Sequence, residues 1–217
     1  MKKIFLTTIV SFVTLLAIAD KGIVVTQKFA TATTDAGVTL TWYVTANNVK
    51  LSMQFKDSKV NNTITHFIPN TKDATLQIYT DGPVPDGVQK SYYATPASAI
   101  KPSTANQYTR IDVKASGEVK EVSGIKCEKY IITTNLNITE AWVTKNVKFN
   151  TYQYHPYFPD NTPLLGLYNA QINGVVLSAV TKDLTGKELS KYELMGAQEK
   201  DIPATEFSIP EEYKRAQ

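Results

Sequence analysis

The stretch from Val119 to Val147 reads VKEVSGIKCEKYIITTNLNITEAWVTKNV. Two runs that favour strands, 126–134 and 139–144, flank the turn-tolerant Asn135-Leu136-Asn137, so the pattern predicts a β-hairpin. The hairpin carries the chain's one cysteine, Cys127, and one of its two tryptophans, Trp142. Both residue types are usually buried when they occur in strands. We therefore expect this hairpin to lie at the centre of a sheet.

Upstream, residues 39–80 predict four successive antiparallel strands. Apolar and polar residues alternate over 39–46 and again over 50–56, with Asn47-Asn48 as the turn between them. Strands over 63–68 and 75–80 continue the meander. We expect these strands to share one apolar face, which is formed by Leu40, Trp42, Val44, Leu51, Met53, Phe55, Ile64, Ile68, Leu76 and Ile78.

The remaining segments complete a mainly β pattern. Prolines and glycines interrupt residues 81–107, which predicts a long loop excursion with a short strand near Tyr92. Further strands are predicted over 23–30, 108–114, 118–122, 175–182 and 188–198, and a short helix is predicted after Thr162-Pro163. The expected fold is a strongly curved antiparallel sheet or unclosed β-barrel with one or two short helices.

The N-terminus has the composition of a secretory signal peptide. Basic Lys2 and Lys3 precede an apolar run, and the small residues Ala17-Ile18-Ala19 provide a cleavage site. We expect residues 1–19 to be this signal and residues 20–217 to be a single β-rich domain. The apolar run is shorter than the ~20 residues of a spanning helix. The expected product is a soluble exported protein, placed in the bacterial periplasm, with no transmembrane segment after cleavage.

Charge and cysteine content narrow the classes of function. Removal of Lys2 and Lys3 lowers the basic count from 23 to 21 against 20 acidic residues. A nearly neutral chain has no long-range field for nucleic acid, so we expect no nucleic-acid partner. One cysteine cannot form an internal disulfide, so stability must come from the core.

Few residues are candidates for chemistry. Cys127 lies in mid-strand, with Ile125 and Ile131 expected on its own face, which favours a buried and inert thiol. His66 alternates with Ile64 and Ile68, which favours a histidine satisfied within the sheet. His155 lies in a loop-like run and is the one histidine that we keep as a functional candidate. The sequence offers no metal-ligand spacing and no phosphate loop, so we expect no metal, no cofactor and no catalytic residue.

The apolar face allows two interpretations. An ordinary core would cover it with a second layer. A bent sheet around a partly filled cavity would instead use the face to hold a ligand, because larger half-closed barrels enclose apolar space. On the second interpretation the ligand-binding residues are Leu40, Trp42, Val44, Leu51, Met53, Phe55, Ile64 and Ile68.

Three short motifs resemble a family of exported bacterial proteins of unknown function. They are Gly124-Ile125-Lys126-Cys127 with Tyr130, then Trp142-Val143-Thr144, and finally Phe207-Ser208-Ile209-Pro210 with Tyr213. Families of this kind look like the periplasmic lipoprotein carriers, whose half-barrel holds acyl chains on a concave face. The chain departs from this pattern at Ile125, where an aromatic residue is usual, and it has no arginine between Lys28 and Leu51 that could latch a carrier's lid.

The resemblance implies a non-enzymatic periplasmic binding or carrier protein for lipid or lipoprotein acyl chains. The alternative is a cell-envelope interaction module with a fully packed core and no ligand. A third possibility is an enzyme that uses His155.

Overall fold

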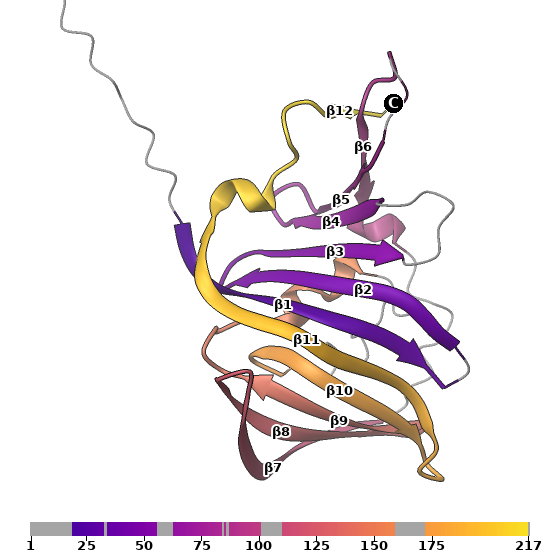
Figure 1. Ribbon diagram of the computed structural model, residues 1–217, viewed down its shortest axis with the longest axis vertical. Helices are drawn as coiled ribbons and strands as arrows, with labels where there is room; N and C mark the ends of the chain where they lie inside the picture. The colour runs from indigo at the N-terminus through magenta and orange to yellow at the C-terminus, as the bar shows by residue number, and fades with distance from the viewer. Residues whose placement is uncertain are drawn as a thin grey trace, which may run out of the picture.

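A computed structural model describes residues 19–32, 34–55, 63–83, 85, 87–100, 110–158 and 172–216. In this part of the chain twelve strands form one sheet in the order β12-β6-β5-β4-β3-β2-β1-β11-β10-β9-β8-β7 (Figure 1). Neighbouring strands are antiparallel except for β12, which runs parallel to β6. The strands are β1 (Ala19–Thr31), β2 (Thr34–Thr45), β3 (Val49–Phe55), β4 (Ile64–Asn70), β5 (Thr75–Asp81), β6 (Ser91–Pro96), β7 (Ile111–Val122), β8 (Ile125–Thr134), β9 (Asn137–Thr144), β10 (Val175–Asp183), β11 (Glu188–Pro203) and β12 (Lys214–Arg215).

The sheet is strongly curved and open. Figure 1 shows β7 to β10 at one end and β4 to β6 at the other, turned away from the plane of β1 and β2. Among the described residues no pairing joins β7 to β12, so the sheet does not close on itself. The predicted fold class, a mainly β chain with a curved and unclosed sheet, is confirmed.

The hairpin predicted over residues 126–144 is formed by β8 and β9. The hydroxyl of Thr134 fixes its turn by accepting hydrogen bonds from the backbone N–H groups of Leu136 and Asn137. Its predicted central position is wrong, because only β7 separates it from the end of the sheet. The centre is instead occupied by β1, which pairs with β2 on one side and with β11 on the other.

Helical structure in the described residues is limited to three 3₁₀ segments, η1 (Ala97–Ala99), η2 (Thr151–Tyr157) and η3 (Ala204–Phe207). The helix predicted after Thr162 lies outside the described residues. Within the predicted excursion, the expected short strand is β6. No described helix is long and apolar enough to cross a membrane.

The main core lies against the concave face of the sheet, and the connection from β9 to β10 packs into it. Trp42 of β2 contacts Phe158 edge to face, with ring centroids 6.1 Å apart. Tyr154 of η2 stacks on Phe149 and donates its hydroxyl hydrogen to the backbone oxygen of Asn47. Aromatic residues of the chain itself therefore fill the space beneath the centre of the sheet.

The pairing between β10 and β11 stops part-way along both strands. The two strands pair only between Ala179–Lys182 and Glu188–Tyr192, although β11 stays paired with β1 as far as Pro203. We call the unpaired stretch between β11 and β10 the seam. Both strands carry a register shift beside the seam. The pairing of β11 with β1 shifts between Thr26 and Gln27 of β1, and the pairing of β10 with β9 shifts between Val176 and Ser178 of β10.

Candidate functional site

The predicted ligand face divides into a buried half and an open half. Strand pairing places Trp42 opposite Leu51 and Leu40 opposite Met53, so β2 and β3 form the predicted hairpin and these residues share one face. Leu40, Trp42, Val44 and Leu51 are almost fully buried and belong to the main core. These four residues pack against protein rather than line an empty cavity.

Ile64 and Ile68 do not share that face, which corrects the prediction. Leu51 pairs with Phe67, so Phe67 lies on the concave side and its neighbours His66 and Ile68 lie on the outer side. Because successive strand residues point to opposite faces, a shift of one residue exchanges the two sets. Ile68 is buried, but in a second, smaller apolar cluster with Tyr79 and Tyr213.

The open half of the face extends over β3 to β6. Met53 and Phe55 continue the concave register of Leu51, and Phe67, Ile78 and Tyr93 follow on the next three strands. The side chain of Phe55 is 50% exposed and that of Tyr93 is 63% exposed, whereas the other three are half-buried against the main core. We call these residues the concave strip: Met53, Phe55, Phe67, Ile78 and Tyr93.

The outer side of the same strands carries a buried polar cluster that the sequence analysis did not predict. Lys50 is buried, and its ammonium group donates to Glu206 of η3 at 2.8 Å and to the hydroxyl of Tyr79 at 3.1 Å. Burial alone would lower the pKa of Lys50, but the hydrogen bonds to Glu206 and Tyr79 outweigh it and raise the pKa.

His66 lies in the middle of this cluster. Its Nδ1 is 2.8 Å from the Ser52 hydroxyl and its Nε2 is 3.0 Å from the Asp81 carboxylate, while its ring stacks on Tyr79. Burial, followed by the charge of Lys50, lowers the pKa of His66, so the ring is neutral at pH 7. Serine, histidine and aspartate also form catalytic triads, but Ser52 is buried here in mid-strand. This arrangement favours a structural role.

The C-terminal segment covers the cluster. Tyr213 donates its hydroxyl hydrogen to Asp81 and packs edge to face on Tyr79. Beyond Tyr213, the Lys214 N–H donates to the Lys90 oxygen and the Ala216 N–H donates to the Tyr92 oxygen, both at 2.9 Å. The segment from η3 to β12 therefore ties the outer sides of β3 and β5 to the edge of β6.

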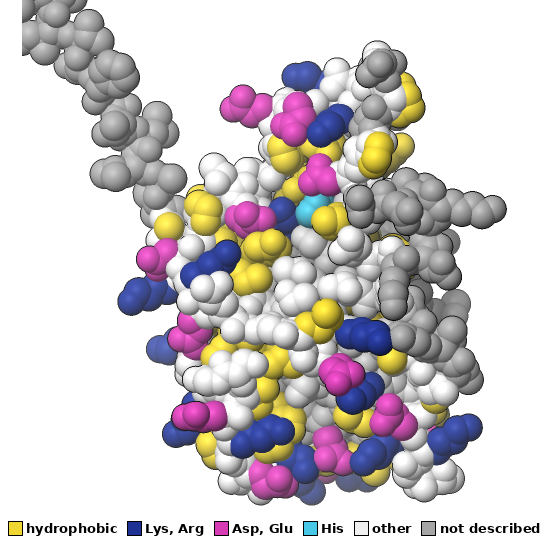
Figure 2. All heavy atoms as spheres, in the orientation of Figure 1, with side chains coloured by type: hydrophobic (Ala, Val, Ile, Leu, Met, Phe, Trp, Pro, Cys, Tyr) yellow, Lys and Arg dark blue, Asp and Glu magenta, His cyan; other side chains and the backbone are white. Residues whose placement is uncertain are grey.

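The β8–β9 hairpin places Cys127 and Trp142 in different surroundings. Cys127 is buried in the main core, as predicted, and burial raises the pKa of its thiol to about 11. Trp142 is only half-buried, because its ring faces the surface beneath the ammonium groups of Lys120 and Lys129. Lys129 also bridges Glu118 and Glu140. In Figure 2 basic and acidic side chains alternate across this lower part of the molecule.

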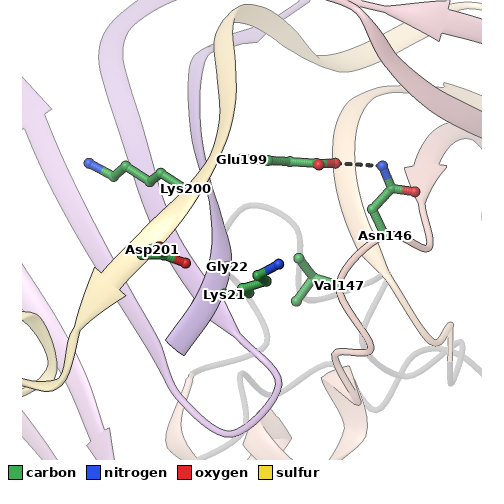
Figure 3. Close-up of a pocket in the computed structure, with 7 residues that line it drawn as sticks. All are labelled: Lys21, Gly22, Asn146, Val147, Glu199, Lys200 and Asp201. Atoms are coloured by element: carbon green, nitrogen blue, oxygen red, sulfur yellow. Dashed lines mark hydrogen bonds between the residues drawn. The ribbon is translucent and has the colours of Figure 1, made fainter. Parts of the chain in front are cut away.

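Two cavities adjoin this region of the chain. One, of about 390 Å³, is lined by Val119, Lys126, Cys127, Glu128, Val143, Lys145 and Asn146. The other, of about 300 Å³, lies at the open end of the seam and is lined by Lys21, Gly22, Asn146, Val147, Glu199, Lys200 and Asp201 (Figure 3). Neither cavity includes a residue of the predicted ligand face.

Other candidates from the sequence have no described chemistry. His155 belongs to η2, but its side chain lies outside the described residues. Within the described residues, no group of three or more histidine, cysteine, aspartate or glutamate side chains is placed to hold a metal ion.

Comparison with known proteins places the chain in a family. Residues 26–213 match DUF4412, a domain of unknown function. The chain belongs to the DUF4412 family. The match covers β2 to β11 completely and includes the second half of β1 from residue 26, so both the concave strip and the polar cluster lie within the DUF4412 domain. No curated protein matches this DUF4412 chain.

Solved structures resemble the DUF4412 chain only distantly. The structures of PNGF-II in space groups C2 and P2₁ each align with a TM-score of 0.45 and 12% sequence identity. Each alignment covers 90% of this chain and 31% of the PNGF-II chain, so the DUF4412 chain spans about a third of the protein that it matches.

Proposed function

We propose that this DUF4412 protein is a non-enzymatic binding protein of the bacterial cell envelope that holds lipid or lipoprotein acyl chains. The binding site is the concave strip on β3 to β6. The predicted secretory signal supports an envelope location, and the resemblance to lipoprotein carriers supports the class of ligand. The exposure of aromatic side chains on the concave side of the sheet is the observation that carries the proposal.

The strip offers apolar area that the chain itself leaves exposed. Phe55 and Tyr93 are at least half exposed although their strand register points them to the same side as the core. Apolar side chains exposed on the same side of a sheet as partly buried ones mark a ligand or partner site when the surface they form is extended. Met53 suits acyl chains of different length, because its unbranched thioether adapts its shape.

The energy of such binding is sufficient without a charged anchor. Each methylene group that leaves water contributes about 0.8 kcal/mol, so ten methylenes contribute roughly 8 kcal/mol before the costs of association. In a partly open site each methylene stays partly in contact with water, so only part of this free energy is gained. Micromolar affinity is therefore within reach of a fatty-acyl chain.

A fluorescent fatty-acid titration tests the proposal. The wild-type protein should show saturable binding, and Phe55→Asp or Met53→Lys should reduce the affinity at least tenfold while leaving thermal stability nearly unchanged. Val119→Asp is the matched control, because Val119 is equally exposed but lies on β7. Absence of saturable binding, or strip variants that bind like wild type, would contradict an acyl-binding strip.

The packing beneath Trp42 favours a second candidate function. Trp42, Tyr154 and Phe158 fill the centre of the concave side, as a ligand-free interaction module would require. Val44→Asp distinguishes the two halves of the face. Since Val44 is buried, the charge should unfold the protein instead of only removing binding.

A further inference from the structure

The seam leaves one side of β11 without a strand partner. From Glu193 to Pro203, β11 pairs with β1, but no described strand lies along its other edge. All four residues from Gln198 to Asp201 are exposed, so this edge is accessible. An unpaired strand edge presents a row of backbone N–H and C=O groups. Another extended chain can form hydrogen bonds with every group in this row, as in the addition of a strand to a sheet.

The seam is held open by specific contacts and is not a frayed end. Gln27 of β1 is fully buried, and its side-chain amide donates to the backbone oxygens of Val176 at 3.0 Å and Leu177 at 2.8 Å. The amide thus satisfies carbonyl groups of β10 beside the place where its pairing with β11 ends. Buried carbonyl groups need such a partner, because leaving them unpaired is costly.

At the other end of the seam a side-chain contact spans the gap. Asn146, in the turn after β9, donates its side-chain amide to the carboxylate of Glu199 on β11. Figure 3 shows Glu199 pointing towards Asn146 while Lys200 points away from it. The cavity of about 300 Å³ lies beside this contact. A hydrogen bond between two exposed side chains is weak enough to be replaced by a bound segment.

The same sheet already accepts a short extended segment at another edge. β12 pairs with β6 through backbone hydrogen bonds, and its partner strand was otherwise the end of the sheet. The third edge, on β7, is interrupted in its middle by a register shift around Gly117, whose φ is +81°. A cavity adjoins β7 at Val119 as well, but only the cavity at β11 lies at the open end of a gap within the sheet.

We propose that an extended peptide segment of a partner protein adds to β11 between Leu194 and Asp201. The register of β1 and β11 places Ala197, Glu199 and Asp201 on the concave side of this edge. Glu199 and Asp201 are therefore acidic at alternate positions of this edge, and Lys21 of the neighbouring β1 lies opposite Asp201. The site therefore fits a segment with a small apolar residue followed by basic residues at alternate positions.

Hydrogen–deuterium exchange with three model peptides tests this proposal. Each peptide has ten residues, blocked ends and alternating threonine and valine. The first carries two lysines at alternate positions, the second carries glutamates there, and the third carries prolines that remove backbone donors. The lysine peptide should slow exchange in residues 193–201 at least tenfold, the glutamate peptide should act more weakly, and the proline peptide should have no effect.

Closing the seam provides the decisive variant. In a Cys127→Ala background, Asn146→Cys and Glu199→Cys can be joined by a short thiol cross-linker across the contact that they replace. The cross-linked protein should lose the protection, and the same protein before cross-linking should keep most of it.

Failure of the lysine peptide to protect residues 193–201, equal protection of β7, or protection that survives cross-linking would overturn the proposal. Phe55→Asp leaves this readout unchanged, so the peptide site and the acyl site are tested separately.

Discussion

Gln27 of β1 donates its side-chain amide to the backbone oxygen of Leu177, which lies 150 residues later on β10. In the sheet order β11 separates these two strands. The contact therefore crosses over a strand on the concave side, and it holds the two halves of the curved sheet at a fixed separation.

Replacement of Gln27 by leucine should lower stability. The change keeps a similar volume but leaves the buried oxygens of Val176 and Leu177 without this donor, at a cost of about 1 to 3 kcal/mol. Urea denaturation monitored by circular dichroism measures the loss. Gln198→Leu is the matched control, because Gln198 is exposed on β11 and its replacement should change stability by less than about 0.5 kcal/mol. Equal effects of the two replacements would show that the amide contributes nothing specific.

The ion pair between Lys50 and Glu206 should hold the C-terminal segment on the outer side of the sheet. Glu206→Gln leaves the buried ammonium group of Lys50 without its charge partner, so stability should fall by about 1 to 3 kcal/mol and exchange should quicken in residues 204–216. In a double-mutant cycle, Lys50→Met combined with Glu206→Gln should cost less than the sum of the two single changes. Strict additivity would argue against the pair.

The pKa of His66 makes stability depend on pH. Because the pKa is lower in the folded protein than its ordinary value of 6.5, unfolded chains bind a proton that the folded form does not. The contribution of His66 to the free energy of unfolding is therefore fully present above about pH 6.5, and it is lost as the pH decreases below that value. Thermal melts between pH 7.5 and 5.5 should show a smaller decline for His66→Gln than for wild type. His155→Gln corrects for the second histidine, and identical declines in all three proteins would exclude His66 as the cause.

Cys127 should react slowly with thiol reagents in the native state. Its burial and its pKa of about 11 leave very little thiolate at pH 8. Labelling by a maleimide should be at least a hundredfold slower in native protein than in urea, as followed by mass spectrometry. Cys127→Ala should cost about 1 to 2 kcal/mol through lost packing. Rapid labelling of the native protein would contradict the buried position.

Local turns explain why some of the fold could be predicted. The short connection Ala46-Asn47-Asn48 fixes the β2–β3 register, and the Thr45 hydroxyl supports it by accepting a hydrogen bond from the Asn48 N–H at 3.1 Å. The β8–β9 hairpin has an equally local turn. Eight residues, 56–63, separate β3 from β4 in the sequence, and a connection of this length does not fix which residues of β4 face the core, so the prediction placed Ile64 and Ile68 on the wrong side.

Long-range pairing explains what could not be predicted. The polar cluster combines Lys50, His66, Asp81, Glu206 and Tyr213, which come from both ends of the domain. The alternation of polar and apolar residues over 50–56 indicated that the outer side of β3 is polar. No feature of the neighbouring sequence indicated that the C-terminal segment covers this side. The seam depends on β1 lying between β2 and β11, an order that hydrophobic periodicity does not encode.

The pairing of β1 with β11 also determines when the protein can fold. Ala19 lies opposite Pro203, so the central strand of the sheet acquires its second neighbour only after nearly the whole chain has been synthesised. Contacts between residues so distant in sequence make folding slow. A ribosome-bound chain would hold the early meander without the strand that completes its centre. The central strand, which is the first to be synthesised, is therefore among the last to have both of its neighbours in place.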